Sequence, residues 1–166
     1  MEVTKFESWE QVSEKMQKER DLSGADLSGL DLSGKRLAGL NAEKMNLSGA
    51  NLNKAVLAGI NLEGGDLSHS NLTEAVIAGA NLEDANLTGA DLSRSKWIGV
   101  NVEGVDFTDA RMDGAQGLAV SWGSAKVPPA EAPEMFPIQL ILAPILALVS
   151  LISVVAIVLL LRRRER

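Results

Sequence analysis

Residues 75–99 read AVIAG ANLED ANLTG ADLSR SKWIG, which is one pattern repeated every five residues. In each group the third residue is large and apolar, the first is small, and the residue between them is usually Asp or Asn. Outward from this stretch, an apolar residue occupies every fifth position from Leu22 to Met112, nineteen in all, without an insertion or a deletion. This period fits neither a helix nor a strand, so it predicts a chain that turns a corner every five residues.

A second period of twenty residues lies on top of the first. The groups KRLAG, AVLAG, AVIAG and SKWIG, centred on Leu37, Leu57, Ile77 and Trp97, resemble each other more than they resemble their immediate neighbours. Four groups per coil would stack such residues on one face. Each coil must bury its apolar side chains against the coils on either side, so only a stack of coils is stable.

The motif A-[DN]-L-x-x recurs along the chain, for example at residues 25–27, 50–52, 80–82, 85–87 and 90–92. It strongly resembles the pentapeptide-repeat family over roughly residues 20–116. The resemblance implies an all-β fold, a right-handed quadrilateral β-helix with four repeats per coil. Nineteen repeats then make nearly five coils, and we expect this solenoid to occupy residues 21–116.

An open solenoid end needs a cover, because it exposes unpaired backbone and apolar side chains. Residues 1–20 are expected to form a helical cap, with a helix over residues 5–19 that begins at a capping box of Thr4 with Glu7 or Ser8 with Gln11. Its apolar face consists of Phe6, Trp9, Val12 and Met16. A partner-binding amphipathic helix is the alternative interpretation of this segment.

Three further segments are predicted after the solenoid. Residues 117–136 would form a second cap, in which Leu118, Val120 and Trp122 cover the last coil, and a linker rich in Pro and Ala. Residues 137–161 contain a run of 24 uncharged residues from position 138, long enough for one transmembrane helix. A basic tail follows at residues 162–166, where Arg162, Arg163, Arg164 and Arg166 would flank the membrane.

These segments predict a single-pass membrane protein whose partners include the lipid bilayer and membrane proteins. The orientation is ambiguous. No signal peptide is visible in the sequence, which favours a cytoplasmic solenoid, whereas the arginine tail favours the opposite orientation by the positive-inside rule. We expect a cytoplasmic solenoid, and an exported surface protein held by a sorting-type C-terminal anchor is the alternative.

The composition excludes several kinds of chemistry. The chain has no cysteine, no tyrosine and one histidine, which excludes thiolate chemistry and leaves little for acid–base or zinc catalysis. No phosphate-binding loop or metal-ligand pattern is present, so we expect no enzyme activity, no cofactor and no metal. The net charge of -6 is more negative before the arginine tail, so no nucleic-acid partner is expected.

Two faces of the predicted solenoid are candidate binding surfaces. One carries no Asp or Asn in its full repeats, and its outward residues form an apolar strip with Arg36 and Lys96 at the two ends. The predicted partner-binding residues are Val56, Ala58, Val76, Ala78 and Ile98. The adjacent face carries an acidic stripe, Glu43, Glu63, Glu83 and Glu103, beside a row of Asn residues; it would bind a basic partner or cations, or simply keep the solenoid soluble.

The sequence therefore predicts a non-enzymatic scaffold that binds proteins through a flat solenoid face, as an accessory or assembly subunit of a membrane complex. Self-association through the same face is a further possibility. Some pentapeptide-repeat proteins mimic DNA and act on gyrase, so the resemblance also implies an alternative function, an acidic DNA-mimicking regulator of a DNA-binding enzyme.

Overall fold

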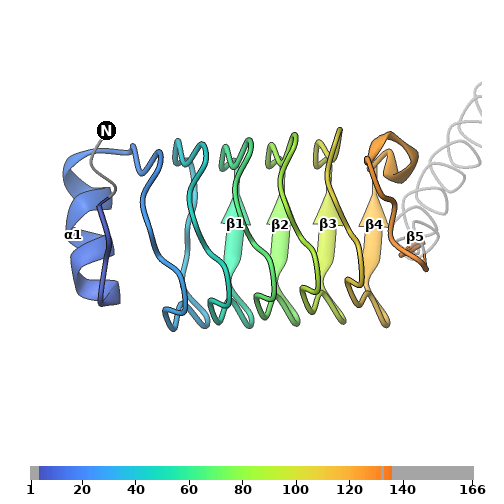
Figure 1. The fold of residues 1–166 in the computed structure, drawn as a ribbon, viewed down its shortest axis with the longest axis horizontal. Helices are drawn as coiled ribbons and strands as arrows, with labels where there is room; N and C mark the ends of the chain where they lie inside the picture. The colour runs from blue at the N-terminus through green and yellow to red at the C-terminus, as the bar shows by residue number, and fades with distance from the viewer. Residues whose placement is uncertain (1–3, 132, 136–166) are drawn as a thin grey trace, which may run out of the picture. The chain divides into compact units, whose positions relative to one another are not determined.

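The computed structural model describes residues 4–131 and 133–135, which form a β-solenoid with a helix at its N-terminal end (Figure 1). Successive coils pair in parallel, and paired residues are twenty apart along the chain, as in Asp21 with Asn41 and Asn46 with Asp66. Each coil therefore contains four five-residue repeats, as predicted. Gly117 is buried at the twentieth inward position, so the solenoid completes five coils and extends slightly beyond the expected end at residue 116.

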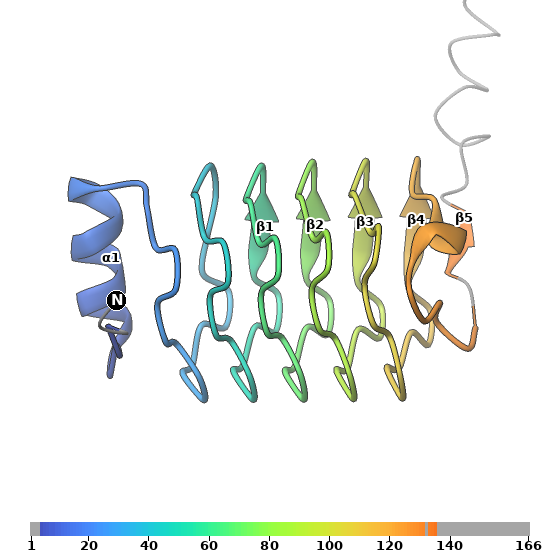
Figure 2. The ribbon, with the colours of Figure 1, turned by 45° about the horizontal axis from the view of Figure 1, so that its top comes forward.

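One face of the solenoid forms a regular parallel sheet. Its strands are β1 (Val56–Ala58), β2 (Val76–Ala78), β3 (Lys96–Ile98) and β4 (Gln116–Leu118), followed by β5 (Glu134–Met135) in the order β1-β2-β3-β4-β5. Figures 1 and 2 show β1 to β4 side by side along the solenoid axis. The other three faces pair mainly through isolated bridges, because each of their repeats bends into a turn immediately after the inward residue.

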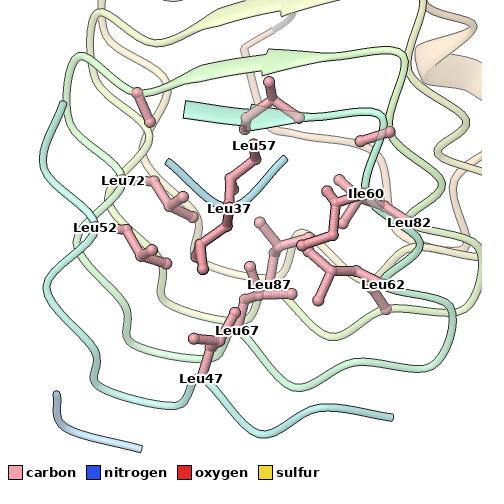
Figure 3. Packing of buried hydrophobic residues seen from close by; sticks show 14 of the residues in the cluster. Leu37, Leu47, Leu52, Leu57, Ile60, Leu62, Leu67, Leu72, Leu82 and Leu87 are labelled. Atoms are coloured by element: carbon pink, nitrogen blue, oxygen red, sulfur yellow. The ribbon is translucent and has the colours of Figure 1, made fainter. Parts of the chain in front are cut away.

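The core consists of stacked columns of aliphatic side chains. Leu37 and Leu57 lie in one column, and Leu52 and Leu72 lie in the next (Figure 3). Every inward residue from Leu22 to Phe107 is almost completely buried. The corner residue two positions after each inward residue has a positive φ, as at Gly59 with φ 60°. Glycine is frequent there because it adopts this conformation without steric cost.

The N-terminal helix is shorter than predicted. Helix α1 spans Trp9–Lys18, and Ser8 is its N-cap, with the Gln11 N–H donating to the Ser8 side chain at 3.5 Å. The residues before it are extended instead of helical, because Phe6 N–H donates to the Asp26 carbonyl at 2.9 Å and so pairs with the first coil. Val12 is completely buried against the core, so α1 covers the first coil.

The C-terminal end of the solenoid is covered by aromatic packing. The rings of Trp97, Phe107 and Trp122 meet edge to face, with centroids 5.3–6.0 Å apart. Trp122 begins the short 3₁₀ helix η1 (Trp122–Ser124) and lies over Gly117, where an added Cβ would approach its ring to 3.0 Å. The indole N–H of Trp97 donates to the Ser95 hydroxyl at 2.8 Å.

The segment expected to be a linker instead packs on the last coil. Phe107 N–H donates to the Val127 carbonyl at 3.0 Å, Glu134 N–H donates to the Ala115 carbonyl at 3.1 Å, and Pro129 is buried. Residues 120–131 thus begin a sixth, incomplete coil, because backbone pairing satisfies the exposed edge of the fifth coil. Leu118 does not cover the coil as predicted, since its side chain lies on the outer side of β4.

The predicted membrane localisation is corrected. In residues 4–131 and 133–135, no helix has the length and apolar character needed to cross a bilayer. The predicted span at residues 137–161 and the arginines of residues 162–166 lie outside the described residues. The described part of the chain therefore gives no support to a single-pass membrane protein.

Candidate functional site

The sheet formed by β1 to β4 differs from the other faces because of one residue in each repeat. On the other faces, the Asp or Asn before the inward residue accepts the N–H two positions later, as when Ser28 N–H donates to Asp26 Oδ1 at 2.9 Å. That bond holds the chain in a tight turn. Val56 and Val76 have no acceptor at this position, so the chain stays extended into a three-residue strand.

We call the outward side of β1 to β4, together with the preceding paired residues 36–38, the strand face. The inward residues Leu57, Ile77 and Trp97 are buried, while their neighbours on both sides are half-buried or exposed. The five predicted partner-binding residues all lie on this face. Ile98 is 38% exposed, which is high for a large apolar side chain. The predicted direction of these side chains is confirmed, whereas their role in binding stays a prediction.

The register of the strands arranges the strand face in two columns. In the first column Arg36 pairs with Val56, Val56 with Val76, and Val76 with Lys96. The second column continues from Ala58 through Ala78 and Ile98 to Leu118. Adjacent strands are about 4.8 Å apart, so the two cations of the first column are separated by about 14 Å, with two valines between them.

A row of alternating charges follows one edge of the strand face. Glu74 accepts from Arg94 at 3.4 Å and lies 3.9 Å from the Lys54 ammonium group. The row borders a shallow depression of about 420 Å³ that Glu74, Val76, Arg94 and Lys96 line. This row was not predicted from the sequence. The twenty-residue period contains the signal, because it places residues 54, 74 and 94 in one column at the corner before the strands.

The predicted acidic stripe lies beside a ladder of hydrogen-bonded amides. Asn61 donates to Asn41 Oδ1 at 3.2 Å, and Asn81 donates to Asn61 Oδ1 at 3.1 Å. Glu43 joins the ladder by accepting from Asn61 at 3.0 Å. The other stripe residues are Glu63, Glu83 and Glu103, which are half-buried or exposed. Two of the four carboxylates, those of residues 43 and 83, therefore support the amide ladder directly.

The described part of the chain contains no group of three or more His, Asp or Glu side chains arranged to hold a metal ion. The acidic stripe therefore has no cluster geometry for a tightly bound cation.

Several aspartates on the turn-forming faces are stabilised in their charged form. The Ser23 hydroxyl donates to Asp21 Oδ1 at 2.6 Å, and this bond, with the Ser23 N–H, lowers the pKa of Asp21 below its ordinary value of 3.8. Hydrogen bonds from Ser28 lower the pKa of Asp26 in the same way, and the Thr108 hydroxyl lowers that of Asp106. These aspartate carboxylates hold the turns in place, and no aspartate lies on the strand face.

Comparison with known proteins identifies the repeat. A family model described as pentapeptide repeats matches residues 21–57, 50–89 and 85–116, which together span more than half of the chain. No curated protein of similar sequence was found.

Several solved structures resemble the chain. A pentapeptide-repeat protein from the Arabidopsis thaliana thylakoid lumen is 35% identical, with a TM-score of 0.46; the alignment covers 54% of this chain and 66% of that one. Rfr23 from the cyanobacterium Cyanothece 51142 is 23% identical, with a TM-score of 0.32 and coverage of 69% and 99%. QnrB1, a plasmid-mediated fluoroquinolone resistance protein, is 21% identical, with a TM-score of 0.42 and coverage of 62% and 65%. This chain thus spans about two thirds of the length of the Arabidopsis protein.

Proposed function

Because this chain belongs to the pentapeptide-repeat family, we propose that it is a non-enzymatic protein-interaction module that binds its partner through the strand face. The observation that carries this proposal is an outward-facing apolar column beside Val56 and Val76, which consists of the exposed Ile98 and the half-buried Ala58, Ala78 and Leu118. Exposed contiguous apolar surface commonly marks a contact site. The rigid sheet beneath it would bind without a cost for ordering the backbone.

The other faces are less suited to a dry interface. Their outward positions are occupied by Asp, Asn, Ser and Thr side chains that bond to one another and to the backbone. A partner on those faces would have to compete with these bonds or leave polar groups unpaired, which is unfavourable. The apolar part of the strand face offers valine, alanine and isoleucine instead, so burying that part costs little desolvation.

The test is Val56→Asp combined with Val76→Asp in the full chain. The solenoid should remain folded, because Asp at this position of the repeat is what the other faces use to close their turns. Association should be lost, because two buried carboxylates would face the partner. In-cell cross-linking followed by affinity capture and mass spectrometry would compare the partners of the variant with those of the wild type, and circular dichroism would confirm the fold.

A matched control is Ser48→Asp combined with Ser68→Asp, which adds the same charge to the same two coils on a different face. This control should retain the wild-type partners. If the valine variant is folded and still captures the same partners, the strand face is not the binding surface.

The alternative hypothesis is an acidic DNA mimic, which would bind its target through the acidic stripe and the faces that carry aspartates. It predicts that Glu63→Gln with Glu83→Gln abolishes an effect of the protein on gyrase supercoiling, whereas the double valine variant keeps it. The strand face argues against a uniformly acidic mimic, because four cations and a single carboxylate lie on it and along its charged edge.

A further inference from the structure

Charge is distributed unevenly over the solenoid. The strand face and its edge row hold Arg36, Lys54, Arg94 and Lys96 and one carboxylate, Glu74. The rest of the described chain holds eight Lys or Arg residues and nineteen Asp or Glu residues. An acidic protein thus carries its apolar face inside a basic border.

This border is arranged along a line. Arg36, Val56, Val76 and Lys96 occupy one column in register, so the order along the solenoid axis is cation, valine, valine, cation. The cations at the two ends are about 14 Å apart, from three steps of about 4.8 Å between strands. Both are exposed, and no salt bridge occupies either of them in the described part of the chain.

An extended peptide has the matching spacing. Side chains on one side of an extended chain recur every two residues, about 6.8 Å, so carboxylates four residues apart are about 14 Å apart. A residue midway between them points to the same side and would lie over the two valines. The complementary segment therefore has an acidic residue, an apolar residue two positions later, and an acidic residue two positions after that.

We infer that the strand face binds an extended acidic segment of a partner protein, which runs along the solenoid axis with carboxylates on Arg36 and Lys96 and an apolar side chain over Val56 and Val76. The inference rests on the proposed function and specifies the partner's chemistry. The depression beside Val76 and Lys96 adds room for one side chain at the second carboxylate.

A protein segment fits this surface better than a nucleic acid does. The two central residues of the column are apolar and would leave a phosphate backbone without partners. A second copy of the chain is also a poorer occupant. Its own strand face is basic, and its acidic stripe carries a carboxylate on each coil from the second to the fifth, with no apolar side chain between them.

The experiment uses the full chain and a fluorescein-labelled 13-residue probe, three repeats of Glu-Ser-Val-Ser followed by a final Glu. Fluorescence anisotropy at low salt should show saturable binding. A probe with Gln in place of Glu should bind about tenfold more weakly, because two exposed ion pairs are lost. A probe with the order Glu-Val-Ser-Ser, which turns each valine to the opposite side, should also bind several-fold more weakly.

Charge reversal in the protein provides the second arm. Arg36→Glu with Lys96→Glu should weaken binding of the Glu probe at least tenfold, since both ion pairs become repulsive. Lys44→Glu with Lys126→Glu makes the same change in net charge away from the strand face and should leave binding within about twofold. Circular dichroism of each variant would establish that the solenoid is folded.

Each result decides between the inferences. Equal binding of the Glu and Gln probes would overturn the acidic preference while leaving an apolar docking face intact. No binding of any probe, or no effect of the Arg36 and Lys96 reversal, would overturn the extended acidic segment, and the partner-capture experiment would still decide the proposed function separately. Tighter binding of a 13-nucleotide single strand that depends on the same two cations would assign the face to nucleic acid.

Discussion

At the scale of single residues, the corner after each inward position is where the backbone adopts the left-handed conformation. The corner residue has a positive φ in twenty consecutive repeats, and in eight of them it is not glycine. Gly99 and Ala119 occupy the same corner column in successive coils, with φ 58° and 55°, and no atom lies within 4 Å of a Cβ built on Gly99. Substitutions between Gly and Ala at these two positions therefore test backbone strain with little change in packing.

We predict that Gly99→Ala lowers the free energy of unfolding by about 1 kcal/mol, because an L-residue is strained in this conformation. Ala119→Gly should raise it by a similar amount. Denaturant unfolding followed by circular dichroism would measure both changes. If both substitutions change stability in the same direction, backbone strain at the corner does not control stability at these two positions.

At the scale of the repeat, hydrogen bonds to ionised aspartates hold the turns on three faces. The pKa values of Asp21, Asp26 and Asp106 are lowered, first by the hydroxyl of a following Ser or Thr and then by its N–H. A group whose pKa is lower in the folded state stabilises the fold above its unfolded pKa. That contribution is lost as the pH falls below about 3.8 and through the folded-state value.

The melting temperature should therefore vary little with aspartate titration between pH 7 and pH 5 and should fall below about pH 4. Asp21→Asn combined with Asp26→Asn should show a smaller fall, because the amide oxygen accepts the same N–H without titrating. Thermal unfolding at pH 7, 5, 4 and 3 would test this. An identical acid profile for the variant and the wild type would show that these turns do not carry the pH dependence.

The sequence predicted the repeat well because every repeat follows the same local rule. An inward apolar residue every five positions, and the twenty-residue resemblance among Leu37, Leu57, Ile77 and Trp97, were sufficient to place the coils and the outward direction of Val56 and Val76. The ends could not be predicted in the same way. Pairing of Phe6 with the first coil, and of Val127 with the fifth, depends on edge backbone groups and not on a repeated pattern.

The charged edge was also missed, for a related reason. Lys54, Glu74 and Arg94 occupy corner positions where the repeat tolerates many residue types, so no motif marks them. Their relation appears only when coils are stacked and residues twenty apart become neighbours. The strand face was predicted as an apolar strip. The stacking of the coils places beside it an edge row with a net positive charge.

At the scale of the whole molecule, the solenoid is a linear stack in which each coil contacts only its neighbours. Helix α1 lies at one end of the stack (Figure 2) and closes it through the buried Val12. Trp122 closes the other end by packing on Trp97 and Phe107. Stability in such a stack is approximately a sum of the stabilities of single coils and of the contacts between neighbours. Changes at opposite ends should therefore act independently.

We predict that Val12→Ala lowers the free energy of unfolding by about 2 kcal/mol and that Trp122→Ala lowers it by about 3 kcal/mol, from lost burial and the cavities left behind. The double variant should lose the sum within about 0.5 kcal/mol. Denaturant unfolding of all four proteins would measure the cycle. A coupling above about 1 kcal/mol would mean that the two ends communicate through the coils.

The fixed interval of twenty residues between paired positions also limits how such a chain can change length through gene duplication. A duplicated segment of five residues would keep every apolar side chain inward, yet it would turn all later repeats by a quarter of a coil. Lys96 would then leave the column of Arg36, Val56 and Val76, and the asparagine ladder would meet valine. Only the duplication of a whole coil would keep the surface columns in register. The binding columns therefore tolerate duplications of twenty residues, whereas the fold alone tolerates duplications of five.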